Sequence, residues 1–386
     1  MSRILHLVAS NSMGGTEKQL VHHARHTRYA SYEVVLGSFQ EESELPEVLS
    51  LASRCGIETV SIPGGVRPGL VDDLANYLRR HHIDLICTHG YKANVVGHFA
   101  AKHAQVPWVP FVRGFTDETW QVTLYERLER SLLVRSPWVV CTSAAPAREL
   151  ARMRRGRPAP IVIPNAVLAP KETSIAQQWT RGRGESGVAD RAFVFGSTAR
   201  LSRDKGHRFL VEAFAQVKKM LPDQPIELLL LGEGPEEAAL RAQVRRSGLE
   251  SLVCFAGLQA KPASWMKEMD CLVHSSIADG AQNSVLEAML LGVPVIATAV
   301  GSVADIVQNG ETGLLVDPES SAALAEAMKR MFGSASLRKQ LTSSAQRHIR
   351  RNFSPDRQKA LLESLYETML GPAFSAAVEE VEHVVA

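Results

Sequence analysis

Residues 193–231, FVFGSTARLSRDKGHRFLVEAFAQVKKMLPDQPIELLLL, decide the fold class of this chain. The stretch begins with an apolar run at 193–197, continues through a polar loop and an amphipathic segment at 207–220, and ends in an apolar run at 227–231. Short continuous apolar runs are typical of strands that are buried on both faces of a parallel sheet. The stretch therefore predicts a strand, a helix and a second strand of an α/β domain.

The same alternation continues in both directions along the chain. Two series of predicted strands, with helical segments between them, cover 4–9, 33–37, 59–62, 85–88, 108–112, 138–142 and 161–163, and then 193–197, 227–231, 253–256, 271–274 and 295–298. Each series predicts one doubly wound domain, a fold whose ligands usually lie at the carboxyl ends of the strands. We therefore expect an α/β protein of two Rossmann-like domains with a cleft between them.

Changes in composition give the expected domain boundaries. Residues 169–190 are polar, contain Gly and lack apolar periodicity, so they predict a connection between domains. The first domain then covers 1–168 and the second 191–355, followed by a helix at 356–372 and a tail at 373–386.

Composition and charge exclude several protein classes. The 386 residues include 43 Lys and Arg against 41 Asp and Glu, a net charge of +2 that is too small for a dedicated nucleic-acid binder. No apolar run approaches the roughly 20 residues that cross a bilayer, and the N-terminus does not resemble a signal peptide, so we expect a cytoplasmic location. The odd number of cysteines and the absence of CxxC spacing predict free thiols at Cys55, Cys87, Cys141, Cys254 and Cys271.

Common nucleotide and metal signatures are missing from the sequence. It contains no GxxxxGK[ST], no HExxH, no GxSxG and no Asp-x-Asp that could hold a divalent ion against a diphosphate. GEGPEE at 232–237 begins like a dinucleotide-binding fingerprint but has Glu in place of the third Gly. The sequence therefore disfavours a nicotinamide site.

Two loops that follow predicted strands carry residues suited to anionic ligands. Gly14 and Gly15 precede a helix, where backbone N–H groups could approach a phosphate or sugar; the alternative is a plain turn capped by Thr16. Arg200 and Lys205 flank the loop after the strand at 193–197 and could clamp a diphosphate. The alternative for these two cations is an ordinary exposed loop.

A third segment, DGAQNSVLEAM at 279–289, places two carboxylates around a predicted helix start. The helix N-terminus near Asn283 would offer free N–H groups to a phosphate, and Glu287 could accept hydrogen bonds from ribose hydroxyls. Ser284 and Glu287 also have the spacing of a capping box, which needs no ligand. A capping box leaves Asp279 unexplained.

Five motifs in this order, GTEKQL, ARLSRDKG, LLGEGPE, DGAQNSVLEAMLLGVPVIATAVGS and NGETGLLVDP, resemble the retaining, nucleotide-sugar-dependent glycosyltransferases of family 4. The resemblance covers nearly the whole chain and is strongest over 193–317. It implies the GT-B fold: two Rossmann-like domains facing a central cleft, with the acceptor bound by the first, the donor bound by the second, and a C-terminal helix that crosses back to the first domain.

The resemblance also implies roles for single residues. Arg200 and Lys205 match the donor-diphosphate pair, Glu287 matches the ribose-binding glutamate, and Gly14 with Gly15 match the glycine loop near the transferred sugar. Asn283 and Ser284 fall at the donor-binding helix start, and Gly257 lies where backbone groups often select the base.

Two positions depart from the family pattern, and a third agrees with it. Asp279 stands where relatives usually carry a glutamate, so its carboxylate is withdrawn by one methylene from the sugar. Arg113 stands where many carry His, and it would hold a phosphate or an anionic acceptor rather than act as a base. His89 matches a frequent cleft position, although a hydrogen-bonded histidine at a strand end is an equally simple interpretation.

The function implied is a retaining transfer of a hexosyl unit from a nucleoside-diphosphate sugar, UDP-sugar favoured and GDP-sugar next, to a glycan or lipid-linked glycan. Cell-surface polysaccharide or lipopolysaccharide synthesis would use such a reaction. Arg200, Lys205 and Asp279 would act at the reacting centre without a metal or other cofactor. The alternatives are a nucleotide-sugar epimerase or a sugar phosphorylase of the same fold, or a non-catalytic nucleotide- or glycan-binding relative.

A run of five arginines adds a hypothesis about location. The cluster either forms a solvated helix end or contacts anionic lipid at the cytoplasmic face of a membrane. Its members are Arg148, Arg152, Arg154, Arg155 and Arg157.

Overall fold

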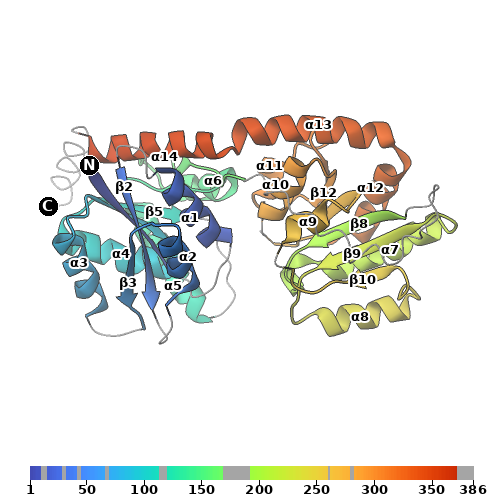
Figure 1. Ribbon diagram of the computed structural model, residues 1–386, viewed down its shortest axis with the longest axis horizontal. Coiled ribbons are helices and arrows are strands. Elements are labelled where there is room, and N and C mark those ends of the chain that lie inside the picture. The colour runs from blue at the N-terminus through green and yellow to red at the C-terminus, as the bar shows by residue number, and fades with distance from the viewer. Residues whose placement is uncertain are drawn as a thin grey trace. The chain divides into compact units, whose positions relative to one another are not determined.

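The computed structural model describes residues 1–9, 15–27, 32–40, 45–65, 69–112, 120–167, 192–259, 261–278 and 282–371 (Figure 1). The chain divides into two compact units. The first unit combines Met1–Ala166 with Pro355–Ala386, and the second is Val167–Ser354. The predicted connection at 169–190 and the predicted tail at 373–386 lie outside the described residues.

The first unit is built on a parallel sheet of seven strands in the order β3-β2-β1-β4-β5-β6-β7. The strands are β1 Ser2–Val8, β2 Tyr32–Gln40, β3 Thr59–Pro63, β4 Leu85–His89, β5 Trp108–Val112, β6 Val140–Cys141 and β7 Ile161–Val162. The helices are α1 Gly15–Thr27, α2 Glu47–Arg54, α3 Leu70–Arg80, α4 Tyr91–Ala104, α5 Trp120–Arg135, α6 Ala144–Met153 and α14 Pro355–Leu370.

The strands of the first unit bury both of their faces. Leu5 and Ile86 point to the side that α3 and α4 cover, whereas Ile4 and Cys87 point to the opposite side. Because neither face is exposed, the strands are continuously apolar, as a parallel sheet requires.

The last helix of the chain, α14, supplies part of the core of the first unit. Leu362, Leu365, Tyr366 and Met369 are each at most 3% exposed and pack on Ile4, Cys87, Val109 and Phe111 of the sheet. Figure 1 shows α14 beside α1, and the two helices are in contact. The first unit therefore draws its core from both ends of the sequence.

The second unit repeats the design with a parallel sheet of six strands in the order β10-β9-β8-β11-β12-β13. The strands are β8 Phe193–Thr198, β9 Ile226–Leu231, β10 Val253–Phe255, β11 Cys271–His274, β12 Val295–Thr298 and β13 Leu314–Val316. The helices are α7 His207–Met220, α8 Glu237–Arg246, α9 Pro262–Met266, α10 Gln282–Leu291, α11 Val303–Ile306, α12 Ser321–Gly333 and α13 Ala335–Asn352, with a short 3-10 helix at Arg203–Lys205.

Two apolar clusters cover the two faces of this second sheet. Phe195 packs on residues of α7, α8 and α12, while Leu272 packs on residues of α9, α10, α11 and α13. The predicted α/β class of two doubly wound domains is confirmed. The predicted strands are all present, but the prediction at 33–37 is too short, because β2 runs over Tyr32–Gln40, and the prediction at 138–142 is too long, because only Val140–Cys141 pairs as a strand.

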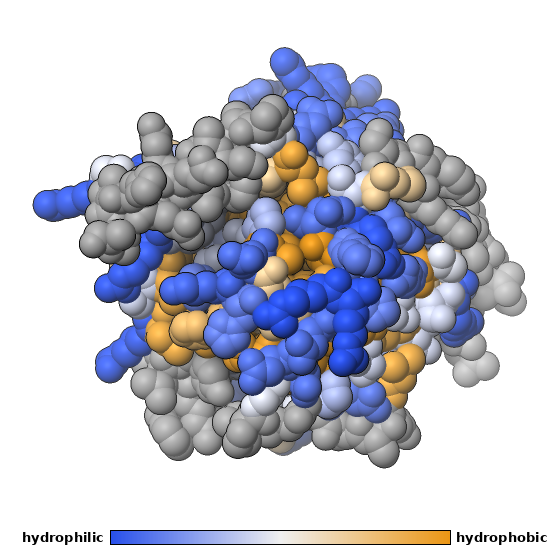
Figure 2. Space-filling view, turned by 90° about the vertical axis from the view of Figure 1, so that its left-hand side faces the viewer, coloured by the Kyte–Doolittle hydropathy of each residue, from blue (hydrophilic) through white to orange (hydrophobic). Residues whose placement is uncertain are grey.

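The five cysteines are free thiols, as predicted, and Cys87, Cys141 and Cys271 are buried. Within the described parts of the chain, no helix combines the length and the apolar character needed to cross a membrane. Hydrophilic residues predominate among the coloured residues of Figure 2, and hydrophobic ones form only small patches between them.

Removal of a side chain from α14 should destabilise the first unit. Leu365→Ala leaves a cavity against the sheet, so we expect a loss of about 2–5 kcal/mol in the unfolding free energy of that unit. Ser364→Ala, at the exposed neighbouring position, should change it by less than about 0.5 kcal/mol. Urea unfolding, with each unit followed separately, measures both variants. Equal stability of the two would contradict this role of α14.

Candidate functional site

In the second unit, the loop after β8 is held against the loop after β9. Leu201 N–H donates to the Glu233 carbonyl at 2.9 Å, and Glu236 N–H donates to the Leu201 carbonyl at 2.9 Å. A Cβ on Gly234 would lie 2.3 Å from the Leu201 carbonyl oxygen, which no side chain could tolerate. The glycines of GEGPEE therefore serve close backbone packing, and this packing fixes one side of the loop that carries Arg200.

The other side of the same loop is fixed to the end of β11. Ser275 Oγ donates to the Lys205 carbonyl at 3.0 Å, and Ile277 N–H donates to the Asp204 carbonyl at 2.8 Å. Gly206 has a φ of 63° and approaches so closely that a Cβ there would lie 2.2 Å from the Ser275 carbonyl oxygen. Because β8 lies between β9 and β11, its loop is held on both sides.

Lys205 presents its charge next to a carboxylate. Its Nζ lies 2.8 Å from Asp204 Oδ2, and its side chain is 14% exposed. Ser202 Oγ donates to the other oxygen of Asp204 at 2.5 Å. Burial would raise the pKa of Asp204, but hydrogen bonds from Lys205 and Ser202 outweigh it, so the pKa lies below its usual value. Asp204 thus orients the Lys205 ammonium, whereas Arg200 at the start of the loop is exposed.

Two buried histidines lie under this loop. His207 opens α7 and His274 ends β11, and they are 2% and 3% exposed. Burial, with a further contribution from the Lys205 charge, lowers the pKa of each to about 4. Both imidazoles are therefore neutral at neutral pH, and Lys205 and Arg200 supply the positive charge at this edge of the sheet.

Helix α10 starts at the same edge, after β11. Asn283 and Ser284 lie in its first turn, where backbone N–H groups have no helical partner, and Glu287 is half-buried one turn further on. The capping-box alternative is wrong, because that motif needs Ser284 immediately before the helix and the helix already begins at Gln282. The Ser-x-x-Glu spacing simply places both residues on one helical face.

Gly257, the predicted base-selecting position, follows β10 with a φ of 67°. Its carbonyl accepts from Gly232 N–H at 2.8 Å, and the next N–H, of Leu258, donates to Glu233 Oε1 at 3.2 Å. The Leu258 side chain is 75% exposed. The loops after β8, β9 and β10 thus form one connected edge.

Three predicted site residues, Gly14, Arg113 and Asp279, lie outside the described residues. Gly15 is the first residue of α1. Arg200, Lys205, Gly257, Asn283, Ser284 and Glu287 all lie at the carboxyl edge of the second sheet. His89 lies at the carboxyl end of β4 in the first unit.

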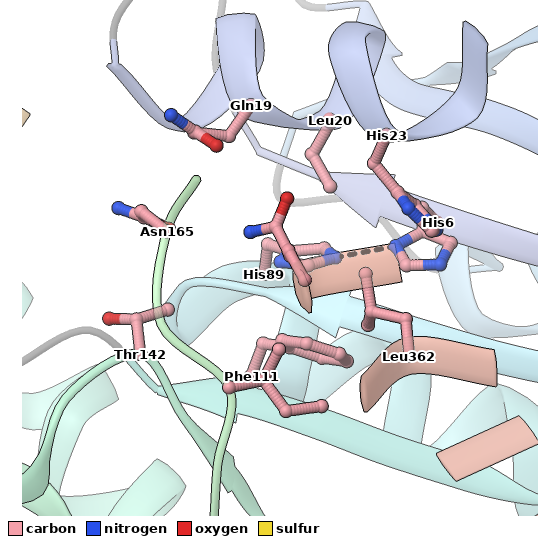
Figure 3. Close-up of a pocket in the computed structure, with 11 residues that line it drawn as sticks. His6, Gln19, Leu20, His23, His89, Phe111, Thr142, Asn165 and Leu362 are labelled. Atoms are coloured by element: carbon pink, nitrogen blue, oxygen red, sulfur yellow. Dashed lines mark hydrogen bonds between the residues drawn. The ribbon is translucent and has the colours of Figure 1, made fainter. Parts of the chain in front are cut away.

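His89 lines a small pocket of about 30 Å³ in the first unit (Figure 3). Gln19 and His23 from α1, His6 from β1 and Gln358 from α14 also line it. Gln19 Nε2 donates to the Ala166 carbonyl at 2.5 Å, and Gln358 Nε2 donates to the Pro164 carbonyl at 3.0 Å. These two amides fix the segment after β7 as one wall of the pocket.

Behind His89 lies a group of buried rings that sequence reasoning missed. His6 Nδ1 lies 3.0 Å from His89 Nε2, and His6 Nε2 lies 2.8 Å from the Tyr366 hydroxyl oxygen. The same hydroxyl lies 2.7 Å from His23 Nε2. A histidine inside an otherwise apolar strand is the only local signal, and it does not identify its partners.

The arginine cluster at 148–157, in and after α6, is not uniform. Arg154 is 2% exposed, and its guanidinium donates to the carbonyls of Leu133, Pro137 and Pro158. The interpretation of five equivalent surface cations is therefore wrong for Arg154, which connects three backbone segments. Arg148, Arg152 and Arg155 are exposed, and Arg157 is half-buried.

Among the described residues, no three His, Cys, Asp or Glu side chains are grouped closely enough to hold a metal ion.

Solved structures of other proteins show which fold class this chain has. Two parallel-sheet Rossmann-like units constitute the GT-B fold. The Anabaena protein HepE, solved in complex with UDP-glucose, is 26% identical with a TM-score of 0.77, over 95% of this chain and 100% of that chain. A glycosyltransferase from Rickettsia africae, 17% identical with a TM-score of 0.80 over 96% of this chain and 99% of that chain, shares the fold.

Two family models then give the family. A model described as Glycosyl transferase 4-like domain matches residues 14–166, and one described as Glycosyl transferases group 1 matches residues 192–334. The chain belongs to the family 4 glycosyltransferases.

Curated relatives match over shorter stretches. D-inositol 3-phosphate glycosyltransferase of Pseudarthrobacter chlorophenolicus is 32% identical over 157 residues, 40% of this chain and 37% of the relative. The capsular polysaccharide biosynthesis glycosyltransferase CapM of Staphylococcus aureus is 28% identical over 179 residues, 46% of this chain and 47% of the relative. The chain thus matches less than half the length of these two relatives.

The close packing of Gly206 can be tested against a glycine of similar backbone conformation. Gly248 has a φ of 65°, and a Cβ added there would meet no atom within 4 Å, so Gly248→Ala should cost only about 1–2 kcal/mol for the left-handed backbone. Gly206→Ala should cost about 1–3 kcal/mol more, because the loop must move away from Ser275. Urea unfolding of the two variants compares the costs. Equal values would contradict the close approach.

Proposed function

We propose that this protein transfers a hexosyl unit, with retention, from a nucleoside-diphosphate sugar to a hydroxyl of a glycan or lipid-linked glycan. UDP-sugar is the favoured donor and GDP-sugar the next. The observation that carries the proposal is the Lys205 loop, which is held on both sides at the carboxyl edge of the second sheet. The UDP-glucose complex of HepE and the name of CapM support the donor class and a role in polysaccharide synthesis.

The proposed role of the second unit is electrostatic. When the bond between the sugar carbon and the diphosphate oxygen breaks, negative charge grows on the diphosphate. Lys205, Arg200 and the N–H groups at the start of α10 would stabilise that charge, while Glu287 would hold the ribose. Asp204 keeps the ammonium oriented before the donor arrives, so less reorganisation is needed during the reaction.

The proposed transfer needs no protein nucleophile. The acceptor hydroxyl approaches the face that the diphosphate leaves, its oxygen bonds to the sugar carbon, and its proton passes to a departing phosphate oxygen. Gly14, Gly15 and Asp279 would contact the transferred sugar, and His89 and Arg113 would contact the acceptor or the donor phosphate. No metal or other cofactor enters this scheme.

Loss of the Lys205 ammonium should slow donor turnover. We expect Lys205→Ala to lower the rate of UDP release from UDP-glucose by roughly 10²- to 10³-fold, the effect of removing one preorganised group at a developing oxyanion. Lys219→Ala, at an exposed position of α7, should leave the rate unchanged. Coupled detection of UDP measures both variants.

This assay, together with UDP titration and analysis of the sugar product, separates the alternatives. UDP binding without turnover would indicate a binding protein, and conversion of the sugar without UDP release would indicate an epimerase. Equal rates for Lys205→Ala and the wild type would contradict the role of the loop.

Turnover of UDP-glucose should also persist in excess chelator. A loss of turnover that added magnesium restores would contradict the metal-free scheme.

We further propose that the protein works in the cytoplasm and visits the cytoplasmic face of a membrane. Arg148, Arg152, Arg155 and Arg157 surround the C-terminal end of α6, where Met153 is 42% exposed. Each basic residue near an anionic surface contributes on the order of 1 kcal/mol, so four of them would hold the protein transiently.

Changing these four arginines to glutamine, with Arg154 retained for stability, should lower co-sedimentation with phosphatidylserine vesicles at low salt. High salt should release the wild type to the same level. The matched control removes four exposed arginines of the second unit, Arg245, Arg246, Arg350 and Arg351. Equal binding by the two quadruple variants would contradict a specific basic surface.

A further inference from the structure

The buried rings of the first unit form a continuous hydrogen-bonded chain, of which the proposed transfer uses only His89. It runs from His23 through Tyr366 and His6 to His89, with successive separations of 2.7, 2.8 and 3.0 Å. The four side chains come from α1, α14, β1 and β4, and none is more than 5% exposed. Figure 3 shows the contact between His6 and His89 beside the pocket.

The number of protons in this chain is limited. Burial lowers the pKa of His6 to about 3, so its imidazole is neutral and carries one N–H. Burial raises the pKa of Tyr366 well above its usual value, so its hydroxyl keeps its proton. His6 must therefore donate through one ring nitrogen and accept through the other.

This limit links the directions of all three hydrogen bonds. If His6 Nδ1–H donates to His89 Nε2, then His6 Nε2 accepts from Tyr366 O–H, and the tyrosine oxygen accepts from His23 Nε2–H. If His89 Nε2–H is the donor, every bond reverses. In the first arrangement a neutral His89 carries its proton on Nδ1, and in the second its Nδ1 is an acceptor.

The pocket in front of His89 suits one small uncharged polar group. Gln19, Thr142, Asn165 and Gln358 line it, and among the described residues no ionisable side chain other than histidine does. A volume of about 30 Å³ has room for a small polar group. A single sugar hydroxyl fits this size and polarity.

We propose that Tyr366 and His6 are positioning residues: they set which ring nitrogen of His89 carries its proton, and hence whether His89 donates to or accepts from a sugar hydroxyl in the pocket. The proposal rests on the proposed function, because the hydroxyl belongs to the sugar substrate. Through Tyr366, the C-terminal helix controls the hydrogen-bonding character of a residue at the carboxyl end of β4.

NMR of protein with isotope-labelled histidine tests this without turnover, because the two neutral tautomers give different ring-nitrogen signals. In the wild type we expect one tautomer each for His6 and His89, assigned with His89→Gln. Tyr366→Phe should move the His89 signals toward the average of the two tautomers. Tyr32→Phe is the matched control, because Tyr32 packs against Tyr366 at 5.3 Å between ring centroids and is no link of the chain.

Unchanged His89 signals in Tyr366→Phe would overturn the proposal. If Tyr366→Phe does not fold, the wild-type spectra still test the proposal. A mixture of tautomers at His6 and His89 in the wild type would overturn the proposal as well. A chain with no turnover of any UDP-sugar or GDP-sugar would refute the proposed function, while the NMR result would still decide the tautomer.

Kinetics then show whether Tyr366 acts through His89. Tyr366→Phe should lower kcat/KM for UDP-glucose by about tenfold, the effect of one lost neutral hydrogen bond. In a His89→Gln background the same change should cause no further loss. Additive losses would assign Tyr366 to packing alone and overturn its positioning role.

Discussion

The buried hydroxyl of Tyr366 is the contact on which the first unit depends. It lies within hydrogen-bond distance of His6 and His23, which precede it by 360 and 343 residues. Three polar groups are buried together here, and each would cost about 1–3 kcal/mol if left without a partner. The contact therefore favours one position of α14 on the sheet, which the apolar packing of Leu362 and Leu365 alone would specify less sharply.

This arrangement has a consequence for folding. The first unit lacks a layer of its core until residues 355–370 are available, although its sheet lies in the first half of the chain. The second unit has no such dependence, because all its strands and helices lie within Val167–Ser354. Contacts between such distant parts of a sequence form slowly, so we expect the second unit to complete its core first during synthesis.

The proposed donor site follows a different principle. It rests on close backbone contacts rather than on buried rings: Gly234 against Leu201, and Gly206 against Ser275. Such contacts leave the loop after β8 little freedom, and Asp204 then orients the Lys205 ammonium. A preorganised cation of this kind is what stabilisation of a leaving diphosphate requires.

The sequence predicted the fold well, because alternation of apolar runs and amphipathic segments is a local property. It predicted Lys205 and Arg200 from their place after a strand. It could not predict Asp204 as the partner of Lys205, although LSRDKG places Ser202, Asp204 and Lys205 together. The spacing of Ser284 and Glu287 left a capping box open as an alternative, because this spacing occurs inside helices as well as at their starts.

Other features depend on contacts between distant segments and left no local signal. Arg154 looks like its exposed neighbours in the sequence, and only the carbonyls of Leu133, Pro137 and Pro158 distinguish it. The histidine chain combines residues of four elements. The apolar pattern of the last helix indicates only that it is buried, and it was the family resemblance that predicted its place on the first domain.

Native-state hydrogen exchange tests the central claim most directly, namely that α14 is an integral part of the first unit. The amides of α14 beyond its first turn should exchange with the same opening free energy as those of β1 and β4, and should lose protection together with them as urea is added. Fast exchange of α14 while β1 and β4 stay protected would contradict the claim.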